Sequence, residues 1–104
     1  MPHRTIKFLP AFHSLILLGQ KTQTRRRECN FIDGEVVHIE DSHINIHILS
    51  IREHDLQNIT IEDVKKEGLY TLETFKDLWN TLHPELNWDM NPRVYVLDFE
   101  VTSK

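Results

Sequence analysis

The stretch that organises the chain is Gly19-Gln20-Lys21-Thr22-Gln23-Thr24-Arg25-Arg26-Arg27. An apolar run precedes it, and Gly19 is expected to end a helix there, because glycine enters the left-handed conformation without steric cost. The following residues alternate as in a strand. This alternation predicts one face with Lys21, Gln23, Arg25 and Arg27 and another with Thr22, Thr24 and Arg26. We expect the positive charge concentrated beside two hydroxyl groups to serve a polar or anionic ligand.

The composition indicates one ordinary globular domain spanning residues 1–104. Hydrophobic residues make up 39% of the chain and charged residues 27%, which is enough for a modest core. The formal net charge is −4. This charge argues against a protein that coats nucleic acid nonspecifically, because such binding needs a broad basic surface. A local basic patch stays compatible with it.

Targeting and redox signals are few. No stretch approaches the ~20 apolar residues that a membrane-spanning helix needs, and the first residues lack the apolar core of a secretory signal. The single cysteine, Cys29, excludes an intramolecular disulfide. We therefore expect a cytoplasmic protein that does not bind membranes.

Hydrophobic periodicity predicts both strands and helices. Strands are expected over 5–9, 35–40, 43–51 and 94–101, the last with Tyr95, Leu97, Phe99 and Val101 on its apolar face. Helices are expected over 11–18, from the cap at Thr60 to Gly68, and from the cap at Thr71 to Pro84. The order favours an α+β fold in which a small, curled antiparallel β-barrel carries flanking helices.

Three features of the chain resemble the ASCH family, whose small domains are similar to the PUA RNA-binding fold. The first is Gly19-x-Lys21-x-x-x-x-Arg26, which matches the G-x-K-x-x-x-x-R signature of the family. The second is the turn into a strand at 33–36. The third is the C-terminal half, with a helix ending at Gly68, an aromatic-bearing helix and a last strand at 94–99. The resemblance spans nearly the whole chain and implies a PUA-like barrel.

Within the family, residues 21–26 resemble most closely a bacterial branch that hydrolyses N4-acetylcytidine to cytidine and acetate. That branch uses a lysine as proton acceptor, a threonine as nucleophile and a glutamate as proton donor. The resemblance assigns these roles to Lys21, Thr24 and Glu67, with Glu62 and Glu73 as alternative glutamates. Many other members carry an acidic residue near the position of Thr24, so a hydroxyl there favours the hydrolase branch.

The proposed chemistry makes demands on these side chains. A lysine acts as a base only when neutral, so the pKa of Lys21 must fall from its usual ~10.4, through burial or neighbouring positive charge. Lys21 and Thr24 have opposite strand parity, so their cooperation requires a bend between them. Arg26 and Arg25 are the candidate substrate-binding residues; Arg25 is expected to lie with Arg27 at a solvated rim.

Other readings of the sequence stay open. A noncatalytic RNA-binding module could use Lys21 and the arginine run against phosphate, and a ribonuclease could use the same cleft. We expect a modified nucleoside or RNA as the partner, and a monomer or weak dimer. Seven histidines raise the question of a metal, but His43 and His47 would lie ~13 Å apart on a strand. We expect no metal and no cofactor.

Overall fold

A computed structural model describes residues 3–102 of the chain. The strands are β1 (Thr5–Ile6), β2 (Gln23–Arg26), β3 (Val36–Ile39), β4 (Asn45–Asp55) and β5 (Arg93–Val101). The helices are α1 (Pro10–Leu17), α2 (Ile61–Lys66) and α3 (Leu72–Leu82), with 3-10 turns at Leu56–Asn58 and Trp88–Met90. No helix in this part of the chain is long and apolar enough to span a membrane.

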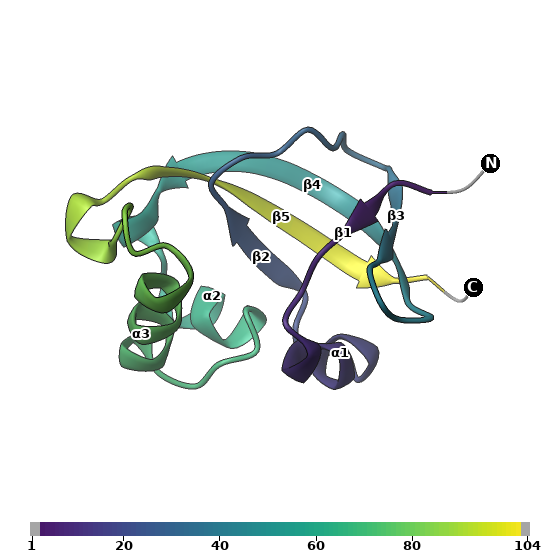
Figure 1. Ribbon diagram of the computed structural model, residues 1–104, viewed down its shortest axis with the longest axis horizontal. Coiled ribbons are helices and arrows are strands. Elements are labelled where there is room, and N and C mark those ends of the chain that lie inside the picture. Colours follow the sequence, from purple (N-terminus) through teal and green to yellow (C-terminus); the bar gives the residue numbers. More distant parts are fainter. Residues whose placement is uncertain (1–2, 103–104) are drawn as a thin grey trace.

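The five strands form one sheet in the order β1-β3-β4-β5-β2, with β1 and β2 at its edges. Three pairings are antiparallel, whereas β1 runs parallel to β3. The sheet is therefore mixed, and the expectation of a wholly antiparallel sheet is wrong. The α+β class is confirmed. The closed barrel is not seen, because the described residues form no ladder between β1 and β2. The curled sheet and the helices along its lower side are visible in Figure 1.

The helices begin and end where their sequences predict. Pro10 opens α1, where its missing N–H costs nothing. Thr60 and Asp63 form a reciprocal capping box at the start of α2, and the Thr71 side chain accepts from the Thr74 N–H at the start of α3. Gly19 follows α1 with a φ of 77°, as expected of a glycine at a helix C-terminus.

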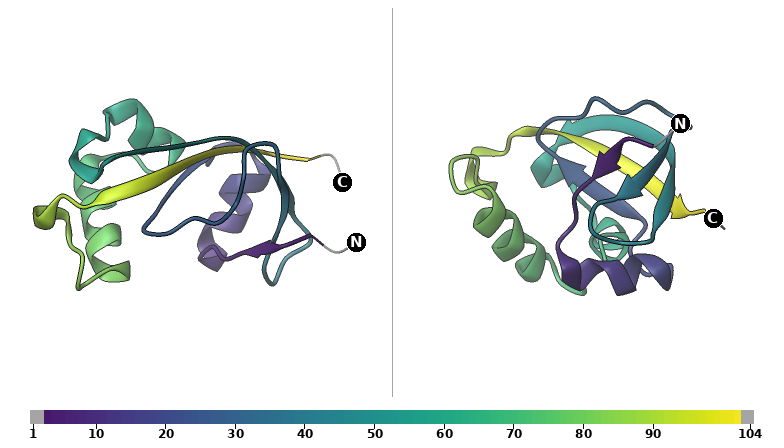
Figure 2. Two further views of the ribbon diagram at one scale, coloured as in Figure 1. Left: turned by 90° about the horizontal axis from the view of Figure 1, so that it is seen from above. Right: turned by 45° about the vertical axis from the view of Figure 1, so that its right-hand side comes forward.

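Two hydrophobic clusters stabilise the fold at opposite ends of the long strands. The larger one packs α1 against the curled sheet, with Ile16, Ile46 and Phe99 fully or almost fully buried. The smaller one packs α2 and α3 against the start of β5, with Val64, Trp79 and Val94 buried. Figure 2 shows α2 and α3 at one end of the molecule and both termini at the other.

A β-bulge in β4 changes which residues share a face. Ile48 pairs with Phe99, but Ser50 pairs with Asp98, so Leu49 is the extra residue and is half-exposed. Beyond the bulge the side chains of β4 exchange faces. In β5, the sequence predicts one apolar face, but both faces carry buried residues, because Val94 and Val96 on the opposite face are also fully buried.

Gly68 provides a test of how α2 is joined to Lys21. Its φ is 89°, and a Cβ built there would lie 3.2 Å from the Lys21 Cβ and 3.3 Å from the Leu15 Cδ1. We expect Gly68→Ala to lower the free energy of unfolding by about 2 kcal/mol, from backbone strain plus crowding. Gly34→Ala is the matched control: its φ is 86° with open space around it, so about 1 kcal/mol is expected. Urea denaturation measures both, and equal losses would contradict the crowding.

Candidate active site

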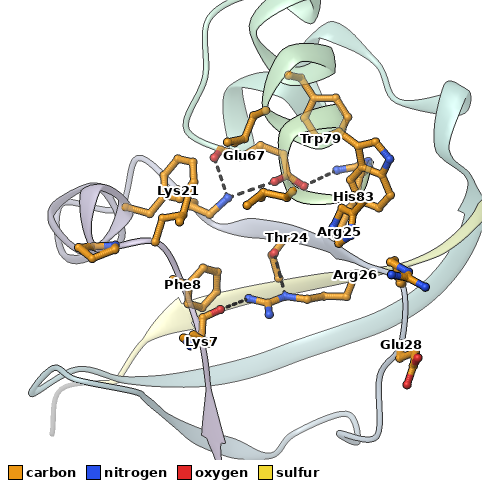
Figure 3. Close-up of a pocket in the computed structure, with 17 residues that line it drawn as sticks. Lys7, Phe8, Lys21, Thr24, Arg25, Arg26, Glu28, Glu67, Trp79 and His83 are labelled. Atoms are coloured by element: carbon orange, nitrogen blue, oxygen red, sulfur yellow. Dashed lines mark hydrogen bonds and ion pairs between the residues drawn. The ribbon is translucent and has the colours of Figure 1, made fainter. Parts of the chain in front are cut away.

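A cavity of about 500 Å³ lies at the free edge of β2, between α1 and α3. Its wall is mostly apolar and carries a few charged side chains, which is typical of a small-molecule site. Figure 3 shows these side chains from several elements facing one space. The lining residues used below are Phe8, Lys21, Thr24, Arg25, Arg26 and Glu67.

Lys21 reaches the cavity from just outside the regular strand. Its backbone N–H donates to the Leu15 carbonyl of α1, and β2 begins only at Gln23. Strand parity therefore does not apply to Lys21, which removes the obstacle to its facing the same cavity as Thr24. The predicted parity does hold within β2: Thr24 pairs with Leu97 on one face, and Arg25 pairs with Val96 on the other.

Lys21 and Glu67 form a buried ion pair. The Lys21 ammonium donates to the Glu67 carboxylate at 3.1 Å and to the Glu67 carbonyl oxygen at 2.8 Å. Lys21 is 3% exposed and Glu67 5%. Burial lowers the pKa of Lys21 from its ordinary value, Arg26 and Arg25 lower it further, and Glu67 opposes them. The same ammonium lies 4.4 Å from the centre of the Phe12 ring, a favourable cation–π contact.

Glu67 takes its position from the end of α2. It is the C-cap residue of that helix, and Gly68 follows it with a left-handed backbone. The neighbouring Lys66 carbonyl accepts a hydrogen bond from the Thr22 N–H, which fixes the end of α2 against the chain that enters β2. The alternative glutamates, Glu62 and Glu73, are exposed in the first turns of α2 and α3 and do not line the cavity.

Arg25 does not lie at a solvated rim, and that expectation is wrong. Its side chain is wholly buried, and its Nη1 donates to the second carboxylate oxygen of Glu67 at 2.8 Å. The same Nη1 donates to the Gln23 side-chain oxygen, and Nε donates to Nε2 of His54 at 3.1 Å. Arg25 reaches these partners because it lies on the sheet face opposite Thr24, where α2 covers it.

Arg26 lies beside Thr24 on the cavity face. Its Nε is 3.3 Å from the Thr24 hydroxyl, its Nη2 donates to the Lys7 carbonyl at 2.7 Å, and the guanidinium stacks 4.7 Å from the centre of the Phe8 ring. Burial lowers the pKa of Arg26 from its ordinary value, which is high enough that the group stays charged. Among residues 3–102, no carboxylate forms an ion pair with it, and its Nη1 has no hydrogen-bond partner.

Two further residues near the cavity, Arg27 and Gln23, differ in their burial. Arg27 is partly exposed and pairs with Glu85 at 2.9 Å, so the solvated rim is confirmed for this residue. The sequence motif predicts no role for Gln23, yet its side chain is fully buried between Arg25 and Asp98. Its place two residues before Arg25 on a strand, hence on the same face, was the available signal.

No group of three or more histidine, cysteine, aspartate or glutamate side chains that could hold a metal ion occurs in the described part of the chain. The arrangement offers a buried amine that donates to a buried carboxylate, a hydroxyl group, and a guanidinium with an unused N–H donor group. These are the groups that acyl transfer requires.

The buried ion pair can be tested through stability. We expect Glu67→Gln to lower the free energy of unfolding by about 3 kcal/mol, because Lys21 would lose its carboxylate partner and Arg25 would keep only Asp63. Glu62→Gln, on the exposed side of the same helix, is expected to cost less than about 1 kcal/mol. Urea denaturation near neutral pH measures both, and a Glu67→Gln variant as stable as the control would contradict the pair's role.

No protein-family model and no curated protein matches the chain. Several solved structures do match over most of its length. An ASCH domain from Lactobacillus crispatus superimposes with a TM-score of 0.75 at 17% identity, covering 96% of this chain and 79% of that one. A ZmASCH mutant protein from Zymomonas mobilis gives a TM-score of 0.66 at 14% identity, covering 92% and 67%.

A Pyrococcus furiosus protein of known solution structure extends the likeness to full length. Its TM-score is 0.67 at 17% identity, and the match covers 100% of both chains. At such low identity the matches establish the architecture alone. The chain has the fold of the ASCH domain.

Proposed function

We propose that this protein is an amidohydrolase that removes the acetyl group from N4-acetylcytidine or a related modified nucleoside, giving cytidine and acetate. The observation that carries the proposal is the buried Lys21–Glu67 pair, which lines one cavity with the Thr24 hydroxyl and the Arg26 guanidinium. The resemblance of residues 21–26 to the hydrolase branch of the ASCH family supports the same assignment. The PUA-like character of the fold also suits a nucleoside ligand.

A shared proton explains how Lys21 can act as a base. Glu67 pairs with both Lys21 and Arg25, and Asp63 lies 3.3 Å from Arg25 as a second carboxylate. Burial disfavours the charged form of Lys21, and repulsion from Arg26 and Arg25 adds to this effect, so the pKa of the amine is lowered. Transfer of the shared proton to Glu67 produces a neutral lysine and a protonated glutamate together, which are the base and the acid that the reaction needs.

In the first half-reaction, neutral Lys21 takes the proton of the Thr24 hydroxyl, and Oγ1 attacks the acetyl carbon. The negative charge that develops on the carbonyl oxygen faces Arg26, whose Nη1 is available. Glu67 gives its proton to N4, the C–N bond breaks, and cytidine leaves an acetyl ester on Thr24.

In the second half-reaction, water attacks the ester and gives a proton to the Glu67 carboxylate. The Lys21 ammonium returns its proton to Oγ1 as the ester bond breaks, so acetic acid leaves and ionises. This step restores neutral Lys21 and protonated Glu67. Arg25 acts throughout as a positioning residue, because its guanidinium holds the second oxygen of Glu67.

Turnover of N4-acetylcytidine tests the proposal. Purified protein is expected to release acetate from it, and Thr24→Val to lower kcat/KM at least about 100-fold, because the nucleophilic oxygen is lost while the shape is kept. Thr24→Ser is the matched control, with a hydroxyl and partial activity. No acetate release at high protein concentration would overturn the proposal.

The pH dependence tests the role of Lys21. The alkaline limb of kcat/KM reports loss of the last proton from the Lys21–Glu67 pair. Since the pKa of Lys21 is lowered, we expect this limb to have its midpoint below 10.5, the ordinary value for a lysine. Circular dichroism at each pH controls for unfolding. Activity that keeps rising through pH 10.5 in folded protein would contradict a catalytic proton shared by Lys21 and Glu67.

The alternative function is noncatalytic RNA binding. The observation in its favour is Arg26, a cavity guanidinium that pairs with no carboxylate among residues 3–102. Arg25 counts against it, since its buried guanidinium is already bound to protein acceptors and is not free for phosphate. A gel shift with structured RNA that is lost in Arg26→Ala, without acetate release by the parent protein, would favour this alternative.

A further inference from the structure

We propose that His54 is a positioning residue of the cavity: its unprotonated Nε2 accepts a hydrogen bond from Arg25 and thereby holds the Arg25 guanidinium on Glu67. His54 lies on β4, away from the cavity, and is half-buried. The inference rests on the proposed function for its effect on catalysis, but the contact itself is independent of it.

The β-bulge places His54 within reach of Arg25. Because β4 exchanges faces after Leu49, His54 pairs with Val94 and Arg52 pairs with Val96. Arg25 also pairs with Val96, from the other side of β5. These side chains therefore share one face of the sheet, and Arg25 crosses that face to reach His54 at 3.1 Å.

The geometry determines the protonation of the ring. Arginine only donates hydrogen bonds, so an imidazole nitrogen that accepts from Arg25 Nε must carry no proton. His54 is then neutral, with its proton on Nδ1. Protonation at Nε2 would replace an acceptor by a donor and place a second positive charge against Arg25.

If the His54 acceptor is lost, Asp63 is the nearest carboxylate that Arg25 does not already hold through a well-aligned hydrogen bond. Its Nη1 is shared by Glu67 and Gln23, and its buried Nη2 has no hydrogen-bond partner of good geometry, although Asp63 lies 3.3 Å away. Without His54 the guanidinium is expected to turn toward Asp63. That movement would weaken its hold on the Glu67 oxygen and alter the proton shared with Lys21.

The charges around His54 favour the neutral ring. Burial lowers the pKa of His54 below 6.5, and so do Arg25 from β2, Arg52 on the same strand and Arg93 from β5; Asp63 from α2 opposes them. The contact is therefore in place above pH 6.5 and is lost as the pH falls through the folded-state pKa. The stability it contributes follows the same direction.

Nuclear magnetic resonance tests the contact directly. The Arg25 Nε–H signal of the full chain is expected to be protected from exchange at pH 7.5 and to lose that protection as His54 titrates. In His54→Gln, whose side-chain oxygen can replace Nε2 at every pH, protection should persist at low pH. In His54→Leu it should be lost throughout. Exchange protection of the Arg25 Nε–H that does not change as His54 titrates would overturn the inference.

Turnover of N4-acetylcytidine tests the effect on catalysis. At pH 7.5, His54→Leu should lower kcat/KM about tenfold, as expected for one lost hydrogen bond to a charged group. As the pH falls below 6.5, the activity of His54→Gln relative to that of the parent should rise. The control variant His47→Gln, elsewhere on β4, should have a relative activity that does not change with pH. A flat ratio for His54→Gln would overturn the positioning role. Absence of turnover in the parent would instead overturn the proposed function, and the resonance experiment would still decide the contact.

Discussion

The rest of the molecule depends on the burial of three charges at one point, where Lys21 and Arg25 meet the carboxylate of Glu67. An isolated charge in this position would cost many kcal/mol, so each group requires the others. Lys21 comes from the end of α1, Arg25 from β2 and Glu67 from the end of α2. The chain can bring these three together only when α1 and β2 have packed with α2, which lies far from them in sequence. The interaction that a catalytic role would require is thus also a marker of this packing.

Much of the fold follows from local signals in the sequence. Thr60 and Thr71 cap their helices as expected, Gly19 ends the first helix, and the alternating isoleucines of β4 lie on the core side. The register of the sheet is less accessible. A one-residue bulge at Leu49 exchanges the faces of the second half of β4, and no glycine or proline marks it. The burial of Val94 follows from the position of α2 and α3, which is a tertiary effect.

The candidate site, like the fold, could be predicted from the sequence only in part. The family resemblance of residues 19–26, and of the segment before the aromatic-bearing helix, assigns roles to Lys21, Thr24 and Glu67, and all three line one cavity. A run of three arginines in sequence usually faces water, and this pattern predicts a rim position for Arg25. Strand alternation directs Arg25 and Arg26 to opposite faces, and a helix covers the face of Arg25. Only the position of α2 over that face distinguishes a buried arginine from a solvated one, and this position is a property of the whole fold.

The cavity is lined by residues of both hydrophobic clusters. Phe8 and Phe12, whose rings lie beside Arg26 and Lys21, belong to the cluster around α1, whereas Phe75 and Trp79 of the cavity wall belong to the cluster at the other end. The cavity therefore lies between the two clusters, which meet at Leu69 and are joined by the long strands β4 and β5. A small flexing of those strands would therefore change the width of the cavity, with the Lys21–Glu67 contact resisting its opening. Entry and exit of a ligand are then expected to involve motion of whole clusters, on the microsecond to millisecond timescale of such collective movements.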